Sequence, residues 1–300
     1  MQKIIGLARA AGLCAPPMSI ALLVISLVGC GGGSSTKPAG GPLSGNWQLM
    51  LTQEFPRPQV MLSVSGFLNQ SSNSITGSVQ VPPSTQNGKC AGVGSLTGSV
   101  NAQNVTFTID NGGTTISLTG TLSTDGQSII GQYSALSGGC YTTPTTGTWT
   151  GELIPPLNGT FTGAFSQSQY MQTLTGINPP NPIQISGTFA QDPNGVASNA
   201  ALTGTLTAVG YPCLRTASLT GTISGQNVVL SVYSYNGNLI GGLGTSSSNP
   251  AIVSVVSGKV TLSSPIGGFS LGSGACPVIS PPGGGSPLSS DSAAVLATLQ

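Results

Sequence analysis

"CAGVGSLTGSVNAQNVTFTI" (90–109) and "CLRTASLTGTISGQNVVLSV" (213–232) align with each other without a gap. In the first stretch Val105, Phe107 and Ile109 alternate with polar residues, and the aligned positions of the second stretch are also apolar. Alternation with a period of two is typical of a β-strand that buries one face. The repeat therefore predicts strands, and the positions that are apolar in both copies predict the face directed toward the core.

The similarity between the two copies continues on both sides of these stretches. "LSGNWQLML", which starts at Leu43, resembles "LNGTFTGAF", which starts at Leu157. "SIIGQYSALSGGC", which ends at Cys140, resembles "SPIGGFSLGSGAC", which ends at Cys276. Each copy thus has the same order of an aromatic strand, a first cysteine, a hairpin and a second cysteine. The chain is interpreted as a tandem duplication.

Each copy is predicted to be an antiparallel meander of about eight strands, which makes the protein all-β. Repeat 1 covers 45–156 and repeat 2 covers 157–278. Asn111-Gly112 and Asp125-Gly126 are two-residue hairpin signals between apolar segments. A meander of this kind closes into a small barrel without exposed edge strands, and a β-sandwich is the alternative. In repeat 1 the strands are expected near 46–53, 60–69, 74–81, 93–101, 104–110, 114–123, 128–135 and 146–154.

The N-terminal segment has the features of an export signal. Two basic residues precede the apolar segment 20–29, which is about half as long as the ~20 residues of a membrane-spanning helix. "LVGC" (27–30) follows and resembles the lipobox of bacterial lipoproteins. The resemblance implies that 1–29 is a signal peptide and that Cys30 carries the lipid. Because Gly31 is not aspartate, it also implies the outer membrane; an ordinary signal peptide is the alternative.

Segments rich in glycine, serine and proline flank the two repeats. Residues 30–44 are predicted to be a flexible tether, and 279–300 a flexible tail. Two or more acyl chains on one cysteine give stable membrane association. The membrane, reached through the lipid anchor, is therefore an expected partner, and the bacterial cell envelope is the expected location.

The composition excludes several kinds of chemistry. Charged residues make up 4% of the chain, against ~25% in ordinary globular proteins, and no basic patch is present, so no nucleic acid partner is expected. The chain has no histidine, which excludes a Ser-His-Asp triad. We expect no cofactor and no enzymatic activity. The alternative is a carbohydrate-active enzyme that uses Glu54 and Glu152, because the first and last strands of a barrel are neighbours.

The four cysteines after Cys30 are predicted to form two disulfides. Four cysteines allow three pairings, and the duplication favours Cys90–Cys140 and Cys213–Cys276, because each copy has one early and one late cysteine. A zinc site is the alternative. The missing histidines and the absence of a C-x₂-C pair argue against it, so no metal is expected.

Tyrosines of repeat 2 form a candidate binding surface. Tyr233 and Tyr235 alternate with Ser234 on the predicted outward face, and Tyr170 and Tyr211 lie in predicted loops. Exposed tyrosines stack on sugars or anchor a protein partner. Alternatively, they cover the junction between the two copies, because large exposed apolar surfaces are uncommon.

Two G-x-W tripeptides occur in repeat 1, "GNW" (45–47) and "GTW" (147–149), and they resemble the motif that opens the first strand of lipocalins. Repeat 2 has "GTF" (159–161) and no tryptophan. We interpret these aromatic residues as core plugs at strand starts. The expected function is a structural or binding role in the envelope, with an envelope polysaccharide or a protein as partner. The alternatives are a barrel that carries a small apolar ligand and the enzyme described above.

Overall fold

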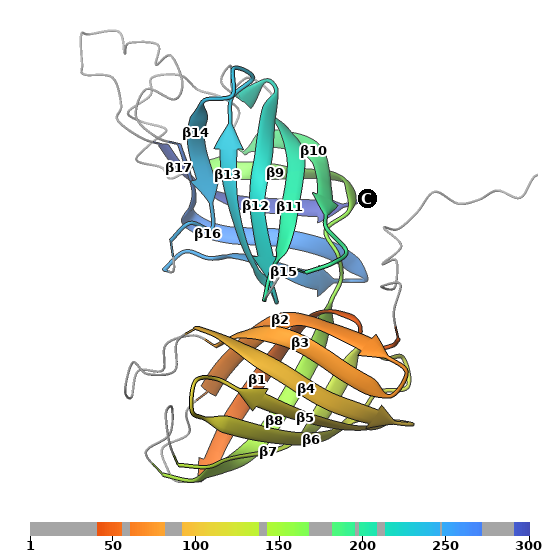
Figure 1. The fold of residues 1–300 in the computed structure, drawn as a ribbon. Coiled ribbons are helices and arrows are strands. Elements are labelled where there is room, and N and C mark those ends of the chain that lie inside the picture. The colour runs from red at the N-terminus through yellow and green to blue at the C-terminus, as the bar shows by residue number, and fades with distance from the viewer. Residues whose placement is uncertain are drawn as a thin grey trace, which may run out of the picture. The chain divides into compact units, whose positions relative to one another are not determined.

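The computed structural model describes residues 41–55, 61–81, 92–137, 143–167, 182–195, 198–208, 214–246, 248–271 and 291–300. The described residues all belong to one compact unit. The described residues are arranged in antiparallel strands that form two successive barrels (Figure 1). None of the described residues belongs to a helix long and apolar enough to cross a membrane.

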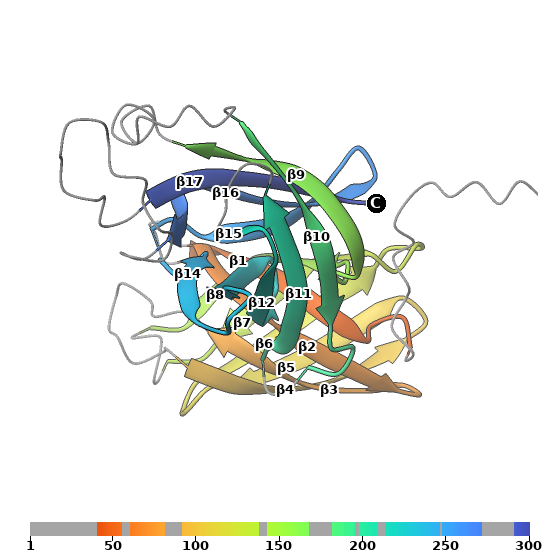
Figure 2. The ribbon, with the colours of Figure 1, turned by 90° about the horizontal axis from the view of Figure 1, so that it is seen from above.

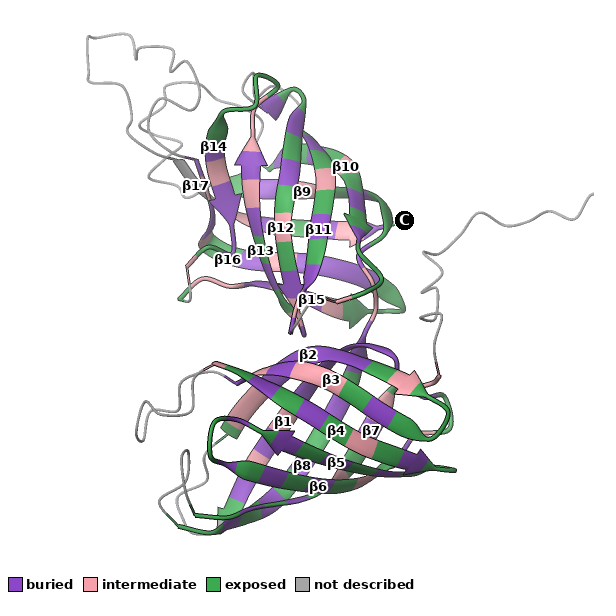
Figure 3. Ribbon diagram, viewed as in Figure 1, coloured by how far each residue is buried: buried purple, intermediate pink, exposed green. Residues whose placement is uncertain are grey.

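Repeat 1 forms a closed barrel, here called barrel 1, in which eight strands pair in chain order and β8 pairs with β1. This confirms the all-β prediction and the barrel, and it rejects the sandwich. Buried and exposed residues alternate along the strands, as the sequence pattern predicts (Figure 3). The strands are β1 (Gly45–Phe55), β2 (Met61–Ser71), β3 (Ser74–Val81), β4 (Gly92–Asn101), β5 (Asn104–Asp110), β6 (Thr115–Leu122), β7 (Ser128–Ala135) and β8 (Thr145–Ile154).

Aromatic side chains and glycines together fill barrel 1. Trp47 and Trp149 are each 1% exposed, and the rings of Phe107 and Trp149 lie 5.8 Å apart. A Cβ added at Gly131 would lie 2.6 Å from Nε1 of Trp149, and one at Gly98 would lie 2.7 Å from the Phe107 ring. Glycine is therefore needed where an aromatic ring packs against the wall, and the tryptophans of the G-x-W tripeptides are core plugs.

Repeat 2 also closes into a barrel, here called barrel 2. Its order is β12-β11-β10-β9-β17-β16-β14-β13, and the pairing of β12 with β13 completes the ring. The strands β14 and β15 share one position in the wall, because both pair with β13 and with β16. The strands are β9 (Gly159–Gln167), β10 (Ile183–Gln191), β11 (Ala200–Ala208), β12 (Ala217–Ser224), β13 (Asn227–Tyr233), β14 (Leu239–Leu243), β15 (Ala251–Val256), β16 (Lys259–Leu271) and β17 (Asp291–Leu299).

The last strand corrects the expected domain boundaries. The sequence predicts a flexible tail over 279–300, but residues 291–299 form β17, which lies between β9 and β16 (Figures 1 and 2). Val295, Ala297 and Leu299 are at most 5% exposed. Burial of these apolar side chains and closure of the ring explain the strand. Repeat 2 therefore extends to 299 instead of ending at 278.

Polar side chains of barrel 1 contact a turn of barrel 2. Nδ2 of Asn46 donates a hydrogen bond to the Gly225 carbonyl (2.8 Å), and Oδ1 of Asn46 accepts one from the Gly225 N–H (2.7 Å). The Gln226 N–H donates to Oε1 of Gln48 (3.2 Å). Phe67 is 8% exposed and belongs to the apolar core cluster of barrel 2. We call this set of interactions the inter-barrel contact.

Each barrel has two distinct ends. Because the strands are antiparallel, alternate connections lie at the same end. In barrel 2 the connections β9–β10, β11–β12, β13–β14 and β16–β17 share one end, here called the loop end, and the short β12–β13 and β15–β16 turns lie at the other, the turn end. In barrel 1 the loop end carries the connections β1–β2, β3–β4, β5–β6 and β7–β8. The chain enters barrel 1, passes to barrel 2 and leaves barrel 2 at turn ends.

Candidate functional site

Most residues of the predicted sites lie outside the described part of the chain. The strands on either side of each predicted disulfide cysteine are described. In each repeat, the two connections that contain the cysteines start from the loop end of that repeat's barrel. The pairing within each copy stays a prediction. The residues outside the described ranges are Cys30, Cys90, Cys140, Cys213, Cys276, Tyr170 and Tyr211.

Tyr233 and Tyr235 lie at the loop end of barrel 2. Tyr235 is 77% exposed in the hairpin between β13 and β14, and Leu239, the register partner of Tyr233, is 64% exposed. The connections that contain Tyr170 and Tyr211 start from the same end of the barrel. The topology therefore places the flanks of all four predicted tyrosines at one end.

The position of Tyr233 and Tyr235 at the loop end decides between a binding surface and a cover for the junction between the copies. The inter-barrel contact involves Gly225 and Gln226, which form the turn before β13. Tyr233 and Tyr235 lie at the opposite end of β13. The hypothesis that these two tyrosines cover the junction between the copies is therefore wrong.

The carboxylates proposed as a catalytic pair are far apart. Glu152 lies opposite Gln48 in the β1–β8 register, six residues before Glu54 along β1. At ~3.3 Å per residue this separation is about 20 Å, whereas glycosidase carboxylates lie ~5–9.5 Å apart. Glu152 instead accepts a hydrogen bond from Nε2 of Gln226 (3.4 Å). The register excludes the enzyme hypothesis that uses this pair.

Asp125 stabilises a turn. The Ser123 hydroxyl and the Gln127 N–H both donate hydrogen bonds to Oδ1 of Asp125. The bond from Ser123, followed by the bond from Gln127, lowers the pKa of this exposed carboxyl below its ordinary value. Within the described ranges, no three residues among histidine, cysteine, aspartate and glutamate are grouped so that they could hold a metal ion.

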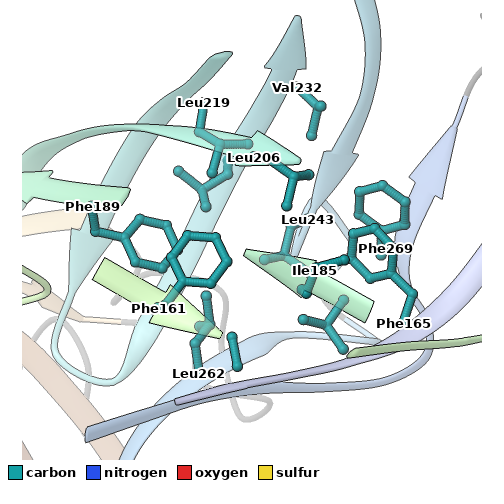
Figure 4. A pocket seen from close by; sticks show the side chains of 13 residues that line it. Phe161, Phe165, Ile185, Phe189, Leu206, Leu219, Val232, Leu243, Leu262 and Phe269 are labelled. Atoms are coloured by element: carbon teal, nitrogen blue, oxygen red, sulfur yellow. The ribbon is translucent and has the colours of Figure 1, made fainter. Parts of the chain in front are cut away.

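Barrel 2 contains an apolar cavity in its interior (Figure 4). Its volume is about 20 Å³, close to the room that one water molecule needs. Two stacked phenylalanine pairs line it, Phe161 with Phe189 (centroids 4.5 Å apart) and Phe165 with Phe269 (4.3 Å). Aliphatic side chains complete the lining. Because ligand pockets are typically ~300–1,000 Å³, a larger ligand requires the lining side chains to move.

The lining of the cavity includes three positions at which repeat 2 has a smaller side chain than repeat 1. Phe161 stands at the position of Trp47, and Leu230 at the position of Phe107. On the closing strands, Trp149 pairs with Leu51, whereas Val295 pairs with Phe165, which aligns with Leu51. Val295 is therefore the counterpart of Trp149. Phe161, Leu230 and Val295 all line the cavity.

A buried hydroxyl lies on the strand beside this cavity, opposite the lining residue Val295, although Ser264 is not itself one of the lining residues. Ser264 on β16 pairs with Val295 and is 8% exposed, and its Oγ has no hydrogen-bond partner among the described residues. Side chains of directly paired residues lie on the same face of a sheet, so Ser264, like Val295, faces the interior. In barrel 1 the residue paired with Trp149 is Gly131. In the sheet register Ser264 thus takes the place of Gly131, whereas the sequence alignment places Gly131 opposite Gly267 in the bulge that follows Ser264.

No protein-family model matches the chain, and searches of curated proteins and of solved structures also give no match.

Sequence reasoning did not identify Ser264 or the interior of barrel 2 as a site. The available signal was the absence of tryptophan from repeat 2 where repeat 1 has Trp47 and Trp149. The counterpart of Trp149 could not be found by alignment, because β17 was expected to be a flexible tail. The inward position of the Ser264 hydroxyl follows from the register of β16 against β17, which the sequence alone does not show.

Proposed function

We propose that this chain is a lipid-anchored protein of the bacterial cell envelope that binds a partner through the loop end of barrel 2. The lipobox-like "LVGC" (27–30) supports the anchor at Cys30 and the outer membrane as its location. The observation that carries the binding role is the exposure of Tyr235, 77%, at the end where the longest connections of barrel 2 gather. Loops held by a rigid scaffold are common binding elements.

The chemistry of this end favours a neutral partner. Tyrosine combines an apolar ring with a hydroxyl that forms hydrogen bonds, and it is common at binding sites for sugars and proteins. Charged residues are only 4% of the chain, so attraction of a polyanion has little support. We take an envelope polysaccharide as the first partner to test and a protein as the second. The proposed role is non-catalytic.

Replacing Cys30 with serine tests the anchor. The serine hydroxyl does not replace the thiol that receives the lipid, so Cys30→Ser is expected to leave the protein unprocessed or to release it into the soluble fraction. Membrane fractionation and intact mass spectrometry measure both effects. Wild-type protein that carries no lipid mass, together with unchanged fractionation of the variant, would contradict the anchor.

Replacing Tyr235 with alanine tests the binding surface. Because the side chain is exposed, the free energy of unfolding is expected to change by no more than ~0.5 kcal/mol. Retention of the protein on isolated envelope polysaccharide is expected to fall. The matched control is Val256→Ala, since Val256 is an exposed apolar residue at the turn end of barrel 2 and should leave retention unchanged. Equal retention of wild type and both variants would count against this surface.

A second candidate function is a carrier of a small apolar ligand inside barrel 2. The cavity favours it, because the lining side chains are all apolar and the counterparts of two tryptophans are smaller. Its small volume limits the ligand to a small molecule that the lining residues admit by moving.

A further inference from the structure

We propose that barrel 2 binds one small, uncharged planar aromatic molecule that carries a single hydrogen-bonding group. The ligand would occupy the space that the Trp149 indole occupies in barrel 1, with its polar group at Ser264. This inference depends on the carrier function proposed above and is independent of binding at the loop end.

The two barrels differ in the side chains at the position of the Trp149 indole. In barrel 1 the indole of Trp149 lies inside the barrel against Phe107, with ring centroids 5.8 Å apart. In barrel 2 the counterparts are Val295 and Leu230, and both line the cavity. Repeat 2 therefore has a smaller side chain at the position of the indole, in surroundings that remain apolar but in which Phe165 replaces Leu51. A free aromatic molecule of similar size is the chemical equivalent of the missing side chain.

The hydroxyl of Ser264 determines the polar group of the ligand. In barrel 1 the indole N–H of Trp149 donates a hydrogen bond to the Thr119 carbonyl (3.0 Å), and Gly131 lies beneath the indole nitrogen. In the sheet register of barrel 2 Ser264 takes the place of this glycine, and its buried Oγ has no hydrogen-bond partner among the described residues. A buried hydroxyl without a partner costs about 1–3 kcal/mol. An N–H or O–H of the ligand would supply the partner.

The wall of barrel 2 has a break through which a ligand could enter. Between Ser264 and Phe269 the β16–β17 register shifts, so residues 265–268 bulge from the ladder. On the other side of β16, β15 pairs with residues 259–263 and β14 pairs with residues 269–271. Residues 264–268 therefore have no ladder partner in β14 or β15. A wall with fewer ladder hydrogen bonds opens at a lower cost in free energy. The break adjoins Ser264, where the polar group of the ligand is placed.

The lining determines the charge of the ligand. None of the described residues that line the cavity is charged, and moving an ion into such surroundings is far more costly than moving a neutral molecule. The cavity of about 20 Å³ is smaller than an indole, so Phe161 and Phe165 must shift when the ligand enters. These two residues belong to the two stacked pairs, which can separate without breaking a hydrogen bond.

Titration of the intact protein with indole, followed by calorimetry and by NMR shifts of the barrel 2 phenylalanine rings, tests the proposal. Indene, which has the same shape without an N–H, is the comparison ligand. We expect saturable indole binding with one site. Ser264→Ala should weaken indole binding about 2–10-fold, the range for one lost hydrogen bond, and leave indene binding unchanged. Val295→Trp, which restores the residue of barrel 1, should abolish binding of both.

Absence of saturable indole binding to the wild type would overturn the proposal, as would undiminished binding to Val295→Trp. If Val295→Trp does not fold, Leu230→Phe restores the other residue of barrel 1 and should weaken binding in the same direction. Equal loss of indole and indene binding in Ser264→Ala would reject the role of the hydroxyl. Tyr235→Ala should bind indole as wild type does, so failure at the loop end and failure in the interior can be distinguished.

Discussion

Truncation of Phe107 to alanine is expected to lower the free energy of unfolding by about 3–5 kcal/mol, the range for a buried phenylalanine. Phe107 is 2% exposed, its ring contacts Trp149, and it packs over Gly98. Removing it leaves a cavity that the rigid wall of barrel 1 cannot close. Chemical denaturation followed by tryptophan fluorescence measures the change, since both tryptophans belong to barrel 1.

Thr108→Ala is the matched control for this prediction. Thr108 is the next residue of β5 and faces outward, so the free energy of unfolding should change by no more than ~0.5 kcal/mol. The counterpart Leu230, 1% exposed in barrel 2, should behave like Phe107, with a loss of about 2–5 kcal/mol. A neutral Phe107→Ala together with a destabilising Thr108→Ala would mean that the inward and outward faces have been exchanged.

Replacing Asn46 with alanine is expected to cost about 2–4 kcal/mol, because two buried backbone groups lose their partners. The N–H and the carbonyl of Gly225 both bond to the Asn46 amide, and both residues are buried. The inter-barrel contact couples the barrels, so its loss should also separate their unfolding transitions. In differential scanning calorimetry, Asn46→Ala should show two separate unfolding peaks. In the wild type the two transitions should lie closer together.

Thr160→Ala provides the comparison for Asn46→Ala. Thr160 occupies the same position in repeat 2 and is exposed. We expect no more than ~0.5 kcal/mol of change and an unaltered calorimetric profile. An Asn46→Ala protein with wild-type stability and wild-type coupling would show that the inter-barrel contact contributes little to either.

Local sequence pattern predicted most of barrel 1. The strands expected at 74–81, 104–110 and 128–135 have the bounds of β3, β5 and β7. In these segments alternation is regular and the turns carry Gly, Asn or Asp, so propensity, pattern and turn chemistry agree. Comparison of the two repeats added the identity of the inward face, which a single copy would have indicated less clearly.

The features that sequence reasoning missed depend on distant parts of the chain. Residues 291–299 are rich in alanine and leucine, which are strong helix formers, and only pairing with β9 and β16 makes them a strand. Asn46 lies at an outward position of β1, where the pattern predicts a solvated side chain. Its burial depends on a turn 179 positions away. No local pattern records either interaction.

The position of β17 also sets an order of events during synthesis. β9 pairs with β17 along its length, with Phe161 opposite Leu299 and Gln167 opposite Ala293, so the first strand of barrel 2 waits for the last before the ring can close. All strands of barrel 1 have left the ribosome before most of barrel 2 has been made, since β8 ends at Ile154. Barrel 1 can therefore close while the chain is still growing. Until β17 is complete, barrel 2 has unpaired strand edges on β9 and β16, and during this interval the nascent chain is most exposed to aggregation.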